Sequence, residues 1–128
     1  LVKRWNNKNS QANIYLLSSV GLNTENSKSM ATMGIHGDWE NRQFMVMEML
    51  EHYSYNSAWV SNTRLAYSPF KADYSKTSFW FIAHYRVEYH NDSYSYMFFP
   101  VVRLFKKNYL FELGSNGENS FLSFMTHF

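Results

Sequence analysis

Charged side chains recur in the middle of several alternating segments of this chain, and they carry both signs. Seven of them have the parity opposite to their aromatic neighbours: Glu48, Arg64, His84, Arg86, Glu88, Arg103 and Glu112. Because a β-strand places alternate residues on opposite faces, this set predicts one polar face. Carboxylates and guanidinium groups on such a face would pair with one another, so the chemistry predicted is a structural charge network that fills an interior.

Histidine and methionine suggest a second kind of chemistry, since imidazole and thioether groups are ligands for copper or silver. The chain has five His and seven Met. His36, His84 and His90 form the candidate ligand set, but their spacing does not fix their mutual distances. Met45, Met47 and Met49 are assigned to the apolar face instead, as hydrocarbon contacts. The favoured interpretation has no metal and no cofactor, with the three histidines as the alternative.

The stretch "EHYSYN" offers a third possibility, nucleophilic catalysis. His52 and Ser54 are two residues apart, on the same face of a strand, where an imidazole could activate a hydroxyl group. Glu51 has the other parity, and Glu48 is distant along the strand, so no acidic partner is identified. We therefore expect that the protein is not an enzyme, and His52 with Ser54 is retained as the catalytic alternative.

Seven clusters of turn-forming residues divide the chain, which predicts eight strands. The clusters lie at residues 23–29, 40–43, 55–58, 68–76, 90–93, 106–108 and 115–120. The alternation is clearest at residues 78–90, where Phe79, Phe81 and Tyr85 oppose Trp80, His84 and Arg86. A helix would scatter these two sets around its circumference. Pro100 predicts a bulge or an unpaired stretch in the sixth strand, because proline removes a ladder donor.

Composition restricts the architecture. The chain has 128 residues, one fifth of them aromatic, with a mean hydropathy of −0.43 and no Cys. Eight such strands fit either a membrane barrel with an apolar outside or a soluble lipocalin-like barrel with an apolar inside. The two-signed mid-strand charges and the aromatic rings near strand ends favour the membrane barrel. Trp80, Phe99 and Phe105 are expected to fill its interior.

The predicted fold is therefore an all-β, eight-stranded antiparallel up-and-down transmembrane β-barrel with short loops. It spans residues 12–128, and residues 1–11 are expected to form a periplasmic N-terminal arm. The net charge of +2 comes with scattered basic residues, so nucleic acid is not an expected partner.

The closing stretch "FLSFMTHF" resembles the C-terminal strand of bacterial outer-membrane β-barrel proteins. The residues that carry the resemblance are Leu122, Phe124, Thr126 and Phe128. The resemblance implies an outer-membrane location, contact with the lipid bilayer and lipopolysaccharide, and a terminal strand that serves as the signal for the barrel-assembly machinery. It identifies a class and no particular member. The His52-x-Ser54 element is also similar to that of outer-membrane lipid A deacylases, where it lies in a later strand.

The expected function follows from the loops. With the N-terminus in the periplasm, the outside connections at 23–29, 55–58, 90–93 and 115–120 are too short for a receptor head or a lid. We therefore expect a structural or accessory subunit of a larger envelope complex. The alternatives are a lipid A-modifying hydrolase that uses His52 and Ser54, and a soluble lipocalin-like binder of a small ligand.

Overall fold

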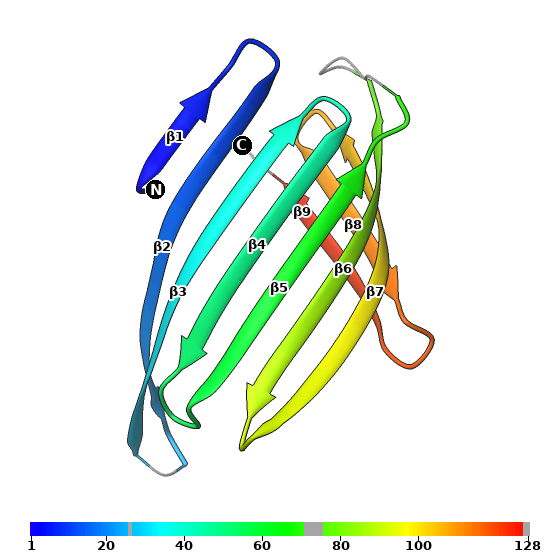
Figure 1. Cartoon of the computed structure of the whole chain (residues 1–128). Helices are drawn as coiled ribbons and strands as arrows, with labels where there is room; N and C mark the ends of the chain where they lie inside the picture. Colours follow the sequence, from blue (N-terminus) through cyan, green and yellow to red (C-terminus); the bar gives the residue numbers. More distant parts are fainter. Residues whose placement is uncertain (26, 71–75, 127–128) are drawn as a thin grey trace.

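The computed structural model describes residues 1–25, 27–70 and 76–126, which form one antiparallel sheet of nine strands. The strands are β1 (Lys3–Asn6), β2 (Ser10–Asn23), β3 (Lys28–Asn41), β4 (Phe44–Tyr53), β5 (Ala58–Tyr67), β6 (Ser78–His90), β7 (Ser93–Lys106), β8 (Tyr109–Ser115) and β9 (Ser120–Thr126). Each strand pairs with the next in chain order, so the all-β, up-and-down topology is confirmed (Figure 1). Among the described residues, β1 and β9 do not pair, and the sheet is not closed into a barrel by hydrogen bonds.

The ninth strand arises from β1, which lies inside the segment expected to be an N-terminal arm. Residues 3–6 pair with residues 11–14 of β2. The connecting turn is closed by a hydrogen bond from Asn7 N to Ser10 O of 2.8 Å. Because this hairpin has a polar sequence, β1 was not predicted as a strand, and the sheet has nine strands rather than the predicted eight.

All seven predicted breaks fall between consecutive strands, although the break at residues 68–76 includes residues 71–75, which lie outside the described residues. A two-residue turn joins β6 to β7 through Asn91 and Asp92, whose φ values are 50° and 59°. Two positive φ values are the signature of a type I′ hairpin turn, which Asn and Asp tolerate better than other side chains. The turn from β8 to β9 is held by the Asn116 side chain, whose Oδ1 accepts hydrogen bonds from the backbone N–H groups of Glu118 and Asn119.

Residues 1–25, 27–70 and 76–126 contain no helix with the length and the hydropathy that a membrane-spanning helix requires.

The two faces of the sheet differ in polarity. We define the inner face as the one that carries Asn62, Arg64 and Ala66 of β5, and the outer face as the opposite one. On β6 the predicted split is confirmed, because Phe79, Phe81 and Tyr85 are exposed on the outer face while the alternate residues turn inward. Alternation in the sequence likewise predicts that the charged residues of β3, β5 and β8 lie opposite their aromatic residues, and the pairing confirms it: Asp38, Arg64 and Glu112 face inward, whereas Trp39, Tyr67 and Phe111 face outward.

Strand β4 has the opposite phase to the one expected. Met45, Met47 and Met49 face inward, and Met45 packs against the buried core rather than lying on the outer face of the sheet. Phe44 and Val46 are exposed on the outer face. Assignment of the three methionines to the outer apolar face was therefore wrong, because the pairing of β4 with β5 fixes which parity turns inward.

A small core occupies the inner face. Ala66, Ile82 and Val101 are buried there, on three adjacent strands. They are covered by four larger side chains, namely Met45, Trp80, Phe99 and Phe121. Gly114 permits this packing, because a Cβ at that position would overlap the ring of Phe121.

The inner face is concave. In a flat sheet, β5 and β8 would lie roughly 14 Å apart, which is three strand spacings. Nevertheless Arg64 of β5 reaches Glu112 of β8 across the two intervening strands. The sheet curls accordingly, and in Figure 1 β8 and β9 turn behind the middle of the sheet.

Pro100 lies where β7 loses one of its two neighbours. Pairing of β7 with β6 runs without a break from Ser93 to Phe105, so no bulge is found. Pairing with β8 begins only at Val101. Residues 93–100 therefore pair on one side only, which matches the predicted unpaired stretch.

Candidate functional site

The most buried charged cluster lies on the inner face and joins three strands. Glu112 of β8 is only 7% exposed. Its Oε1 accepts a hydrogen bond of 2.7 Å from Arg103 Nε, and Arg103 is its direct cross-strand neighbour on β7. Arg64 Nη1 donates to the same oxygen at 3.4 Å. One carboxylate thus holds two guanidinium groups, and the arrangement ties the curled sheet together.

His84 and Asn62 extend this cluster along β6 and β5. His84 Nε2 donates to Asn62 Oδ1 at 3.1 Å, and Asn62 is buried. His84 is the cross-strand neighbour of Arg64, so imidazole and guanidinium lie side by side. His84 Nδ1 is buried and has no hydrogen-bond partner among the described residues. The structure therefore brings together four of the seven predicted network residues: Arg64, His84, Arg103 and Glu112.

Arg86 and Glu88 form a separate pair on the inner face of β6. Arg86 Nη2 lies 3.7 Å from Glu88 Oε2, and both side chains are about two-fifths exposed. An exposed pair of this kind contributes little to stability. These two residues share the predicted face without joining the buried cluster.

Glu48 is not part of the network. It lies on the outer face of β4, and its cross-strand neighbours are Gly37 and Thr63. Its carboxylate accepts hydrogen bonds from Ser61 Oγ and Thr63 Oγ1, each 2.5 Å long. Its predicted inner position was wrong for the same reason as the methionine assignment, because the whole strand has the opposite phase.

A second inner cluster, which the sequence pattern did not reveal, joins β1, β2 and β3. Asn13 is 4% exposed. Its Oδ1 accepts from Arg4 Nε at 2.7 Å, and its Nδ2 donates to Asp38 Oδ1 at 2.6 Å. His36 Nε2 lies 3.4 Å from Asp38 Oδ2, without hydrogen-bond geometry. The only sequence signal was that Asp38 and His36 share a parity, and Arg4 lay outside every predicted strand.

Replacing Asn13 with alanine is expected to lower the free energy of unfolding by about 1–3 kcal/mol. The change removes the acceptor of Arg4 and leaves a partly buried carboxylate oxygen of Asp38 without its donor. Denaturant unfolding followed by circular dichroism measures the change. The control is Asn9→Ala, because Asn9 is exposed in the turn. An equal effect of the two substitutions would show that the Arg4–Asn13–Asp38 chain contributes nothing.

The alternative metal set is dispersed. His36 lies beside Asp38 on β3, His84 contacts Asn62, and His90 lies at the far end of β6. Within the described part of the chain, no group of three or more His, Cys, Asp or Glu side chains is placed to hold a metal ion.

The alternative catalytic pair is not connected by a described hydrogen bond. The His52 ring lies on the outer face, with its centroid 4.6 Å from that of Trp59. Ser54 Oγ accepts a hydrogen bond from Ala31 N at 2.9 Å. Glu51 points to the inner face and accepts from Tyr53 OH. Within the described residues, the geometry supplies neither a base for Ser54 nor an acid that would orient His52.

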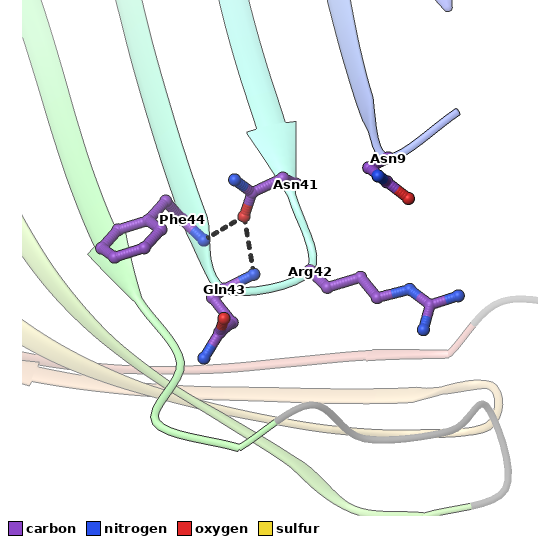
Figure 2. A pocket seen from close by; sticks show the side chains of 5 residues that line it. All are labelled: Asn9, Asn41, Arg42, Gln43 and Phe44. Carbon is purple, nitrogen blue, oxygen red and sulfur yellow. Dashed lines mark hydrogen bonds between the residues drawn. The ribbon is translucent and has the colours of Figure 1, made fainter. Parts of the chain in front are cut away.

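A polar hollow of about 290 Å³ lies beside the turn between β3 and β4 (Figure 2). Asn41 Oδ1 accepts hydrogen bonds from the N–H groups of Gln43 and Phe44, which closes the turn. Arg42 is the one charged side chain of the hollow and extends away from Phe44. The hollow is a product of turn geometry, and it brings together no set of catalytic or ligating groups.

The terminal-strand residues are described in part. Leu122 and Phe124 are exposed on the outer face of β9, and Thr126 is half-buried at its end. Phe128 lies outside the described residues.

Comparison of the chain with protein-family models, with curated proteins and with solved structures found no match.

Proposed function

We propose that this chain forms part of the lipid-facing wall of a bacterial outer-membrane β-barrel, and that it serves as a structural or accessory subunit of an envelope complex. The observation that carries this proposal is the inverted polarity of the sheet. Its exposed outer face is apolar, and its buried charges lie on the concave inner face, which is the arrangement typical of membrane barrels.

The outer face supports contact with hydrocarbon. Leu65, Phe81 and Leu113 are each more than half exposed, although they lie on the body of the sheet. Around Ala83 and Pro100, where the side chains are small, these residues border a shallow apolar groove of about 690 Å³. A contiguous apolar surface of this kind marks a membrane or protein contact, whereas single exposed apolar residues do not. Acyl chains would fill the groove without losing hydrogen bonds.

Aromatic rings mark both ends of the outer face. Trp39, Phe44, Tyr67 and Tyr109 lie near the end of the sheet that includes the β3–β4 turn, and Trp59, Tyr89 and Tyr94 lie near the other end. Amphipathic rings are favoured at the two boundaries between hydrocarbon and water. Strand β5 has 10 residues, and a tilted strand needs about 9–11 to cross a membrane.

The free edges of the sheet support the role of a subunit. β9, and β2 beyond Ile14, pair with a neighbouring strand on one side only, so in the described residues the backbone groups on the other side have no strand partner. Unpaired edges are not tolerated in hydrocarbon, because each unsatisfied backbone group costs several kcal/mol. Under this proposal the edges pair with strands of a larger assembly. The outer face would then contact lipid and lipopolysaccharide, and β9 would be recognised by the barrel-assembly machinery.

No specific observation supports either of the two alternative functions. The contacts of His52 and Ser54 do not support a lipid A hydrolase. A soluble lipocalin-like binder would enclose the aromatic face, but Phe79, Phe81, Tyr85 and Phe111 are exposed.

The membrane proposal predicts that the folded chain requires detergent for extraction and migrates differently on a denaturing gel before and after heating. Paired strands resist unheated detergent, so the folded form keeps its compact shape, and its circular dichroism spectrum is that of a β-rich protein. A chain that stays in solution without detergent and migrates identically in both lanes would contradict the membrane proposal.

After mild detergent extraction, a native gel should show the chain in a larger complex, whereas a lone monomer would contradict the accessory role.

A further inference from the structure

Glu48 is an exception on the outer face. Among the described strands β2–β9, it is the one acidic side chain that points outward, and it lies near the middle of β4. Ser61 Oγ donates to its Oε1, and Thr63 Oγ1 donates to its Oε2. Two hydroxyl groups on the adjacent strand thus fix the orientation of an exposed carboxylate.

This carboxylate has acceptor positions to which no described residue donates a hydrogen bond. An ionised carboxylate offers about four acceptor positions, and the two hydroxyl groups occupy two of them. Among the described residues, no basic side chain forms an ion pair with Glu48. Lys3 lies in the same cross-strand row, beyond Ile14 and Gly37, but its ammonium group stands 4.9 Å from the Trp5 ring.

A notch of about 310 Å³ opens beside Glu48 on the outer face. Its lining includes Trp5, Ala12, Gly37, Trp39, Val46 and Glu48. Gly37 has no side chain to occupy the notch. The space above it is free, since a Cβ at this position would come no closer than 4.0 Å to the nearest group, the Asn13 carbonyl oxygen. The notch therefore combines two indole rings, an apolar floor and one oriented carboxylate.

We propose that Glu48 and this notch bind a basic side chain, lysine or arginine, of a membrane-embedded partner protein. This inference rests on the proposed function and names one contact of the accessory subunit. An ionised group that faces lipid is costly and marks a functional contact with a partner group. The complementary charge fits the unused carboxylate positions, the aliphatic stem fits the apolar floor, and the Trp39 ring attracts a cation, whereas the Trp5 ring already contacts the ammonium group of Lys3.

The test uses a synthetic transmembrane helix with one central lysine, and a matched helix with leucine at that position. Each carries an acceptor dye and is co-reconstituted with the protein in phosphatidylcholine vesicles. Energy transfer from the protein's tryptophans measures association. We expect the lysine helix to associate at least tenfold more tightly than the leucine helix.

Two variants of the protein separate the parts of the site. Glu48→Gln removes the charge, and Gly37→Leu places a side chain in the notch, with its Cβ no closer than 4.0 Å to the Asn13 carbonyl oxygen, so each should reduce the preference for lysine to less than twofold. The matched control is Glu51→Gln, on the inner face of the same strand, which should retain the full preference. Equal association of the two helices, or a preference that survives in Glu48→Gln, would overturn the inference.

Failure of this inference is distinguishable from failure of the membrane proposal. Each variant is first tested for insertion by its heat-dependent migration on a gel. A protein that inserts but shows no preference for the lysine helix refutes the docking site alone. A protein that never requires detergent refutes the membrane proposal, and with it the docking site.

Discussion

Replacement of Glu112 with glutamine is expected to destabilise the protein by about 3–5 kcal/mol, the cost typical of breaking a buried ion pair from one side. The carboxylate is nearly buried, and it is the acceptor for both Arg103 and Arg64. An amide of the same size would leave two guanidinium groups on the inner face without a counter-charge. Denaturant unfolding in detergent micelles or vesicles measures the loss of free energy.

A triple variant serves as the control for this prediction. Arg64→Met, Arg103→Met and Glu112→Leu together remove all three charges while keeping apolar volume at each position. Replacement of a complete buried ionic cluster is often neutral or stabilising, so the triple variant should recover most of the stability lost in Glu112→Gln. If Glu112→Gln alone unfolds like the unsubstituted protein, the cluster does not hold β5, β7 and β8 together.

Replacement of Phe98 with arginine is expected to cost about 2–4 kcal/mol when the protein is folded in a bilayer. Phe98 is 51% exposed on the outer face, and it pairs with Tyr85 near the middle of β6 and β7. If this face meets hydrocarbon, the guanidinium group must be dehydrated or must reach the boundary. Unfolding of the protein in vesicles of defined composition measures the free energy.

Tyr94→Arg is the matched control on the same strand and the same face. Tyr94 lies one residue after the start of β7, near the expected boundary with water, so its replacement should cost about 0–1 kcal/mol. On a face that meets water, both substitutions would change the stability by no more than about 0.5 kcal/mol. A small, equal effect at both positions would therefore contradict the lipid-facing assignment.

Local chemistry made the connections between strands predictable. Asn91 and Asp92 adopt positive φ in the turn from β6 to β7, and Asn116 accepts two backbone hydrogen bonds in the last turn. These preferences belong to the residues themselves and need no distant contact. The faces of β5, β6 and β8 were predictable as well, because their aromatic and charged residues have opposite parity.

The phase of β4 was not predictable, since both of its parities are largely apolar. Phe44, Val46 and Leu50 have one parity, and three methionines have the other, so alternation identifies a strand without orienting it. The charge of Glu48 led to the wrong assignment, because it placed this parity on the inner face. Pairing of Glu48 with Thr63 settled the matter, because neighbouring residues of a sheet must share a face.

The hairpin of β1 and β2 escaped prediction for a different reason. Its stability on the inner face comes from Arg4, Asn13 and Asp38, which contact one another across three strands. Each of these residues by itself is typical of a loop or a solvated surface. Only the register of the sheet brings them together.

The sequence by itself determined that the chain is all-β, where all its strands except β1 end, and which side of most strands carries the charges. Those properties depend on backbone preferences and on the two-residue period of a strand, both of which are local. The tertiary structure decided which charges meet, as in the contact of Arg64 with Glu112, and it decided that Glu48 points outward beside a notch. Such contacts depend on the curl and register of the whole sheet, and these result from packing between residues that are far apart in the chain.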